Sequence, residues 1–113
     1  MNDLTKKSLS SLVEGIKKKE FTSQEITKSF IENSQKAKKL NTYITTNFDK
    51  ALNQAKSFDT KKDFKGLLSG IPIAVKDLFC TKDVKTTAGS KMLSNFIPTY
   101  ESTVTSNLWK EGA

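Results

Sequence analysis

Lys76 is the residue of this sequence best placed to do chemistry, because it ends an apolar and β-branched run. The run Gly70-Ile-Pro-Ile-Ala-Val75 predicts a short buried strand, with its proline near the start, where a missing ladder donor costs least. In a strand, Ile71, Ile73 and Val75 point to one face and Lys76 to the other. Open α/β sheets bind ligands at the carboxyl ends of their strands, which is where this amine would lie.

A lysine can act as a general base only when its amine is neutral. An ordinary lysine, with a pKa near 10.4, is neutral in roughly one molecule in 2,500 at pH 7. Apolar surroundings disfavour the charged form, and a depression of about three units costs on the order of 4 kcal/mol. The alternative is a lysine at a strand end that extends to water or pairs with Asp77. These features alone leave both interpretations open.

The residues after Lys76 also have two interpretations. Asp77 either orients Lys76 or caps the following turn. Thr86, Thr87, Gly89 and Ser90 close a polar loop of small residues. Their short side chains and free backbone groups either line a substrate pocket or form a plain turn.

Cysteine and histidine usage excludes several kinds of site. Cys80 is the only cysteine and there is no histidine, so an internal disulfide, a cysteine-based metal cluster and an ordinary zinc site are excluded. We expect Cys80 to be a small buried packing residue and Trp109 to lie in the core or an interface. The serines of the second half are expected to serve loops and caps: Ser69, Ser90, Ser94 and Ser102.

The charge balance is basic but contains no arginine. All 19 basic residues are lysines, the net charge is +7, and 14 of the lysines lie in residues 1–65. Nucleic-acid binding usually recruits arginine, so a solvated lysine-rich surface competes with an RNA or acidic-partner surface. No apolar run approaches the ~20 residues that span a bilayer, and no signal or transit peptide is recognisable. A cytoplasmic location is expected.

Helical spacing and capping signals organise residues 1–65. Apolar residues at helical spacing predict a first helix from Leu9 that ends at the lysines 17–19. Thr22 and Glu25 form a capping box that opens a second helix, which runs to about Leu40. Phe21 is expected to pack on Ile26 as the hydrophobic staple of that helix.

The rest of the chain alternates extended and helical signals. Residues 43–48 are β-branched and aromatic, which predicts a strand. Asp49 is expected to cap a third helix, followed by the polar loop 59–66. Ser102 is expected to cap a last helix that stops at Gly112. A helix followed by glycine is how an α/β protein prepares its next strand, so the chain is expected to be cut off.

Two runs resemble a known enzyme family. Gly66-Leu-Leu-Ser-Gly-Ile-Pro-Ile-Ala-Val-Lys-Asp77, followed by Thr86-Thr-Ala-Gly-Ser90, closely resembles the opening of amidase signature enzymes. Residues 80–87, 90–98 and 103–113 are similar to the tRNA-linked amidotransferase subunits of that family. The resemblance spans nearly the whole chain, but only the first part of such an enzyme.

The resemblance implies a fold and a catalytic role. The fold would be α/β, with a mixed sheet flanked by helices. Residues 1–65 would be a mostly helical segment and 66–113 the truncated start of the catalytic core. Lys76 would belong to a Ser–Ser–Lys triad, whose bridging serine and nucleophilic serine lie beyond Ala113. This chain alone is therefore expected to be inactive.

The implied activity is that of a glutaminase (amidase) subunit in a tRNA-dependent amidotransferase. Ammonia released from glutamine would convert misacylated Glu-tRNA(Gln) to Gln-tRNA(Gln). Two further subunits would complete a heterotrimer, and a partner subunit would use ATP and Mg²⁺ and bind most of the tRNA. No cofactor, metal or membrane is expected for this chain. The alternatives are a stand-alone amidase acting on small amides and a lysine-rich RNA-binding or adaptor module.

Overall fold

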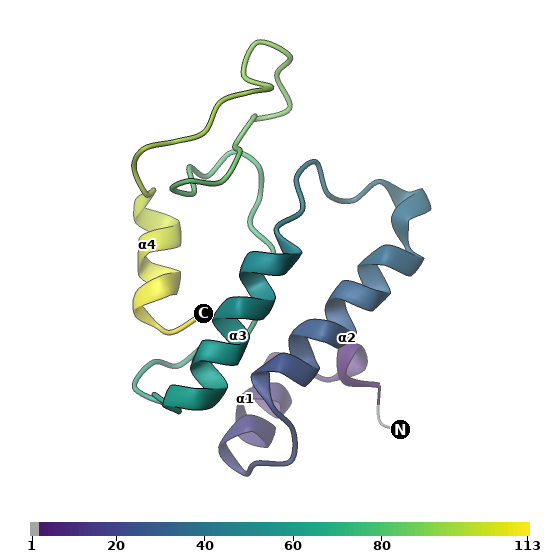
Figure 1. Cartoon of the computed structure of the whole chain (residues 1–113), viewed down its shortest axis with the longest axis vertical. Helices are drawn as coiled ribbons and strands as arrows, with labels where there is room; N and C mark the ends of the chain where they lie inside the picture. The colour runs from purple at the N-terminus through teal and green to yellow at the C-terminus, as the bar shows by residue number, and fades with distance from the viewer. Residues whose placement is uncertain (1–2) are drawn as a thin grey trace.

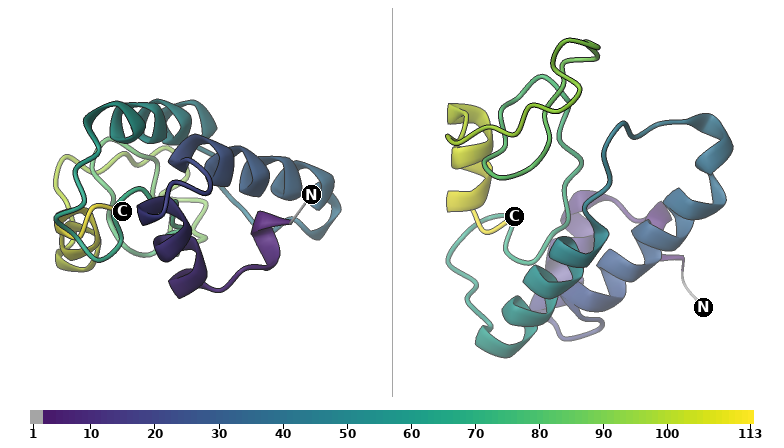
Figure 2. Two further views of the ribbon diagram at one scale, coloured as in Figure 1. Left: turned by 90° about the horizontal axis from the view of Figure 1, so that it is seen from below. Right: turned by 45° about the horizontal axis from the view of Figure 1, so that its top comes forward.

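Two long helices lying side by side dominate the structure, a computed structural model that describes residues 3–113 (Figure 1). α2 and α3 pack together and run in opposite directions, α1 lies against the start of α2, and α4 stands on the far side of α3 (Figures 1 and 2). Residues 62–102 connect α3 to α4 without a helix or strand. The helical elements are η1 (Leu4–Lys6), α1 (Leu9–Lys17), α2 (Ser23–Lys36), η2 (Lys38–Leu40), α3 (Phe48–Lys61) and α4 (Thr103–Lys110).

The predicted capping signals are present. Thr22 Oγ1 accepts from the Glu25 amide at 3.2 Å, and Glu25 Oε2 accepts from the Thr22 amide at 2.7 Å, which completes the capping box of α2. Ser102 Oγ accepts from the Thr105 amide at the start of α4, and Gly112 follows that helix with a φ of +86°. The predicted start of α2 and both ends of α4 are therefore confirmed. The sequence could predict them because each cap depends on residues only a few positions apart.

The predicted boundaries of the other two helical regions need correction. α2 ends at Lys36, and a separate 3₁₀ turn covers Lys38–Leu40. The N-cap of α3 is Asn47, and Asp49 lies inside the first turn of the helix. Its negative charge there still interacts favourably with the positive end of the helix dipole. The cap of α3 was therefore wrongly assigned to Asp49.

The two predicted strands are absent among residues 3–113, so the mixed sheet is not seen in this part of the chain. Residues 43–48 bend and lead into α3, and residues 71–76 form neither a helix nor a strand. A strand requires a partner backbone for its ladder, and no segment of the described chain supplies one. A β-branched composition indicates suitability for a sheet and does not create one.

One hydrophobic core joins the helical layer to the start of the Lys76 run. Leu12, Ile16 and Ile26 from α1 and α2 are buried together with Ile71. The partly buried residues Leu4, Val13, Phe21, Phe30 and Phe58 pack around them. Ile71 therefore ties the segment that leads to Lys76 to α1 and α2. The proposed boundary between residues 65 and 66 stays a prediction.

Candidate active site around Lys76

The first anchor of the Lys76 segment is at Gly70 and Ile71. Ser23 Oγ, buried at the start of α2, donates to the Gly70 carbonyl at 2.5 Å. Gly70 has a φ of +77°, and a Cβ there would lie 2.5 Å from the Phe58 ring. Ile71 is only 5% exposed. Glycine is thus required by both backbone conformation and space, and it lets the chain pass close to α3.

The second anchor is the end of α4. The amides of Leu68 and Gly70 donate to the carbonyls of Glu111 and Gly112 at 2.9 and 3.0 Å. A Cβ on Gly66 would lie 1.9 Å from the Glu111 carbonyl oxygen, so the two backbones are in direct contact. The run that ends at Lys76 therefore begins between α2 and α3 on one side and the end of α4 on the other. We call residues 66–71, which make these contacts, the corner.

Exposure alternates over residues 73–76, as the predicted strand pattern requires. Ile73 and Val75 are half-buried, whereas Ala74 and Lys76 are exposed, but Pro72 is half-buried like Ile73. A two-residue period is therefore present only in the last part of the run. Lys76 itself is exposed in this structure, so the described residues do not bury its amine.

Asp77 is bound to the loop of residues 86–90. Its carboxylate accepts from the Thr87 amide at 2.8 Å and from the Thr87 hydroxyl, and its main-chain carbonyl accepts from the Ala88 amide at 2.7 Å. Burial raises the pKa of the Asp77 carboxyl, but the bonds from Thr87 and the Gly89 amide outweigh burial and hold that pKa below its ordinary value. Asp77 thus closes a loop by bonding to a residue ten positions further along the chain.

The loop itself is arranged around Thr87. Thr86 and Thr87 are 6% and 5% exposed, whereas Gly89 is exposed and a Cβ on it would meet open space. Ala88 and Gly89 have φ values of +50° and +68°, which turn the chain back so that the Ser90 amide donates to the Thr87 carbonyl. Thr87 therefore faces Asp77, and the exposed surface of the turn belongs to Ala88 and Gly89. The sequence missed this link because a spacing of ten residues across a loop has no periodicity.

The other singled-out residues have local roles. Ser69 closes a turn with Gly66, accepting from its amide and donating to its carbonyl, and Ser102 caps α4, as expected. Cys80 is half-buried and its thiol donates to the Tyr100 hydroxyl at 3.4 Å, so the expectation of a buried packing residue is wrong. Trp109 is 37% exposed, which places it outside the core of the described chain.

The surface of residues 3–113 shows no second candidate functional site. The best-formed hollows lie on α3 and between α2 and the start of α3, away from Lys76. Residues 3–113 contain no cluster of acidic or cysteine side chains suited to a metal ion. None of the helices of that same range is long and apolar enough to cross a membrane.

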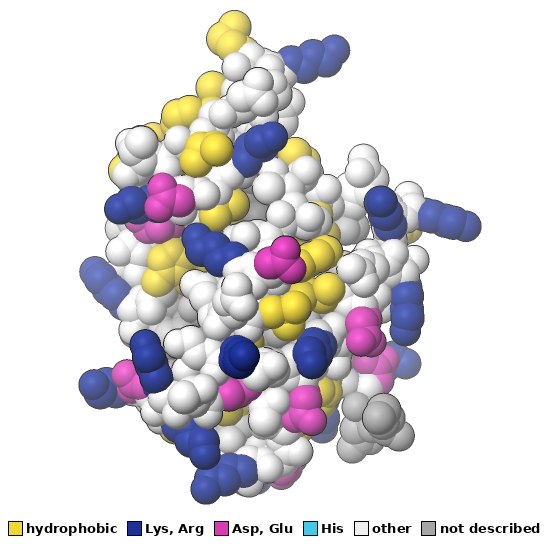
Figure 3. Space-filling view, in the orientation of Figure 1, with side chains coloured by type: hydrophobic (Ala, Val, Ile, Leu, Met, Phe, Trp, Pro, Cys, Tyr) yellow, Lys and Arg dark blue, Asp and Glu magenta, His cyan; other side chains and the backbone are white. Residues whose placement is uncertain are grey.

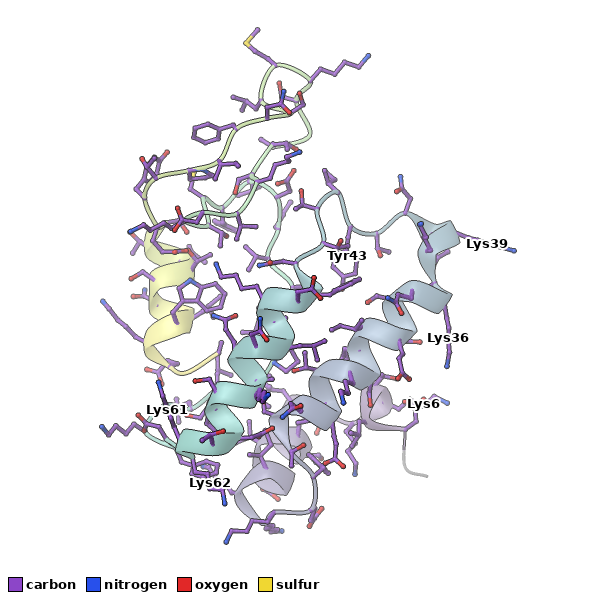
Figure 4. All side chains as sticks on the ribbon, viewed as in Figure 1. Lys6, Lys36, Lys39, Tyr43, Lys61 and Lys62 are labelled. Carbon is purple, nitrogen blue, oxygen red and sulfur yellow. The ribbon has the colours of Figure 1, made fainter. Side chains whose placement is uncertain are left out.

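The lysines do not form one patch. Blue and magenta side chains alternate over the face in Figure 3. Lys36 and Lys39 project near the far end of α2, whereas Lys61 and Lys62 project at the opposite side of the molecule, where α3 ends (Figure 4). A nucleic-acid surface gathers its cations along one face, so this distribution is more typical of a solvated surface.

Comparison with known proteins gives consistent matches over the whole chain. The model of the amidase family matches residues 25–113, a range that includes the Lys76 run and the Thr87 loop. Proteins named as the A subunit of glutamyl-tRNA(Gln) amidotransferase are 62% identical in Pelagibacter ubique and 50% identical in Parvibaculum lavamentivorans, each match covering 100% of this chain. A protein of that name from Rickettsia bellii is 47% identical over 99% of the chain. The chain spans about 23% of the length of each of these relatives.

Proposed function

Because this chain belongs to the amidase family, we propose that it is part of the glutaminase subunit of a tRNA-dependent amidotransferase, with Lys76 as its catalytic base. One observation carries the proposal. The family match spans Lys76 and its surroundings, and the relatives that match the chain from end to end are named as amidotransferase subunits. Those names favour the tRNA-linked branch over a stand-alone amidase.

The proposed reaction is acyl transfer through a serine. The neutral Lys76 amine withdraws a proton, through a bridging serine, from a nucleophilic serine. That serine attacks the side-chain amide of glutamine, ammonia leaves, and water then hydrolyses the acyl-enzyme. Both serines would come from sequence outside this chain. Without them Lys76 has no proton to take, so this chain by itself should not hydrolyse glutamine.

The surroundings of Lys76 suit an amine that becomes covered. Leu78 is 48% exposed and Ala74 is also exposed. Apolar side chains that are accessible to solvent therefore lie two residues before and two residues after Lys76. Covering these side chains would gain roughly 25 cal/mol for each Å² of apolar surface removed from water. That gain would offset the cost of keeping the amine dry and uncharged.

The partners follow from the proposed reaction. Two further subunits would complete the complex, and one of them would use ATP and Mg²⁺ to activate misacylated Glu-tRNA(Gln), which ammonia then converts to Gln-tRNA(Gln). The cytoplasm is the proposed location. The mixed lysine and acid surface supports a division of labour in which a partner subunit binds most of the tRNA.

The decisive experiment compares two ammonia sources in the full-length protein assembled with its partner subunits. Lys76→Ala should lower glutamine hydrolysis by at least about 10³-fold, because the base of a nucleophilic triad is lost. Formation of Gln-tRNA(Gln) from added ammonium should persist, because that reaction bypasses the glutaminase site.

The matched control is Lys85→Ala, which removes an exposed lysine nine residues away and should leave both reactions unchanged. Unimpaired glutamine hydrolysis by Lys76→Ala would refute the assignment. Hydrolysis of small amides without any partner subunit would favour the stand-alone amidase instead.

A further inference from the structure

The Asp77 carboxylate is occupied although a lysine precedes it in the chain. Oδ1 accepts from the Thr87 amide and Oδ2 from the Thr87 hydroxyl. Among residues 3–113, the ion pairs join Lys6 to Asp3, Lys18 to Glu14 and Lys65 to Asp63, so none links Lys76 to Asp77. The groups that set the Asp77 pKa are burial and the donors of Thr87 and Gly89, with no charged side chain of the described chain among them.

The hydroxyl of Thr87 is used in both directions. It donates to Asp77 and accepts from the Gly89 amide at 3.2 Å, in a side chain that is 5% exposed. The Ala88 amide adds a third bond to residue 77 through its main-chain carbonyl. The Cα of Asp77 is therefore fixed relative to the loop, and the Cα of Lys76 lies only ~3.8 Å from it across one peptide bond.

We propose that Thr87 is a positioning residue for Lys76, because it occupies both oxygens of the Asp77 carboxylate, which makes no ion pair with the neighbouring amine, and fixes the backbone that carries the amine. The proposal rests on the proposed role of Lys76 as a base. A carboxylate within ~4–6 Å of a lysine favours the charged ammonium, which cannot accept a proton. By keeping that carboxylate from pairing with the amine, Thr87 favours the neutral, reactive form.

A merely structural role and this electrostatic role differ in their dependence on pH. Loss of a structural hydroxyl lowers activity equally at every pH. Release of the carboxylate instead moves the rising limb of the pH profile to higher pH, because the base then needs a more alkaline solution to lose its proton. Full activity is then recovered at the alkaline end.

The test measures kcat/KM for glutamine hydrolysis between pH 6 and 10 in the full-length protein with its partner subunits. Thr87→Val should move the rising limb by about one unit and lower activity at pH 7 about tenfold, with little change in KM. Thr87→Ser keeps the hydroxyl, so the rising limb of its profile should lie at the same pH as in the wild type. The matched control is Thr86→Val, which removes an equally buried hydroxyl that contacts Val84 and Thr81 instead of Asp77.

The charge is tested by a second substitution. Adding Asp77→Asn to Thr87→Val removes the carboxylate and should return the limb to its wild-type position. A limb that stays shifted in this double variant, or an equal loss at all pH values in Thr87→Val, overturns the proposal. If Thr87→Val does not assemble, Asp77→Asn alone decides: its limb should lie at or below that of the wild type, and a higher limb refutes the inference.

Failure of this inference is distinguishable from failure of the proposed function. If Lys76→Ala abolishes glutamine hydrolysis while Thr87→Val leaves the limb in place, Lys76 is the base and Thr87 does not tune it. If Lys76→Ala retains hydrolysis, both the base assignment and the inference fail.

Discussion

Replacing Gly70 with alanine should loosen the corner from which the Lys76 run starts. The residue has a φ of +77°, a conformation that costs alanine about 1–2 kcal/mol. The added Cβ would also lie 2.5 Å from the Phe58 ring, and overpacking typically costs about 1–3 kcal/mol. The local opening free energy of residues 66–76 should therefore fall by about 2–5 kcal/mol. The lower half of that range is expected, because Phe58 is half-buried and its ring can shift.

Amide hydrogen exchange of the full-length protein measures this local opening directly. The amides of Leu68, Gly70 and Ile71 are hydrogen-bonded within the corner, so their exchange should accelerate by roughly 30-fold or more. Gly89→Ala is the matched control, because its φ is +68° and a Cβ there meets nothing within 4 Å. It should cause only the conformational cost of about 1–2 kcal/mol, confined to its own loop.

The contribution of Phe58 can be separated by a double variant. Phe58→Leu in the Gly70→Ala background shortens the side chain that the new Cβ meets, and should recover part of the lost protection. The reasoning is refuted if Gly70→Ala accelerates exchange in its corner no more than Gly89→Ala does in its loop. It also fails if Phe58→Leu adds its full effect to that of Gly70→Ala, because coupled neighbours should not be additive.

Two further predictions concern carboxylates. Asp59 accepts from the amides of Ser23 and Gln24 at 2.9 Å each, so Asp59→Ala should destabilise the start of α2 by about 1–2 kcal/mol, seen as faster exchange of those two amides. Burial raises the Glu101 pKa, but the hydrogen bonds that this carboxylate accepts, including one from the Thr105 hydroxyl, outweigh burial and hold that pKa below its ordinary value, as the bonds from Thr87 do for Asp77. The stabilisation by these two carboxylates is complete above their ordinary pKa values of 3.8 and 4.5 and is lost as pH falls through the lower folded-state values. Thermal unfolding between pH 6 and 3 should show Asp77→Asn and Glu101→Gln converging with the wild type in acid; parallel curves would contradict this.

Local signals in the sequence were sufficient for the helix starts. The capping box of Thr22 and Glu25 and the cap at Ser102 each involve groups three residues apart, so the sequence contains the whole interaction. The misassignment of Asp49 shows the limit of such signals. Asn47 and Asp49 are both residue types that favour helix starts, so composition alone does not choose between them. Asn47 is the N-cap although its side chain makes no capping hydrogen bond.

Long-range features could not be predicted from the same sequence. The β-branched residues 43–48 and 70–75 were suited to strands, but a ladder depends on a second segment that local composition does not identify. The bonds from Ser23 to Gly70 and from Thr87 to Asp77 span 47 and 10 residues. Lys76 was recognised by its place at the end of an apolar run, whereas the groups that hold its backbone became apparent only in three dimensions.

The segment around Lys76 is held by hydrogen bonds near both of its ends while its amine is exposed. Hydrogen bonds to Gly70 fix where the run begins, and hydrogen bonds to Asp77 fix where it ends. Between these points the described chain has no ladder, so the path of the run is held from its two ends. A base must be held within about 0.5 Å of its working position, and fixing its backbone in advance leaves only side-chain freedom to be lost when the site closes. The backbone groups of residues 72–75 make no hydrogen bond within the described chain, so they are available to pair with a neighbouring strand.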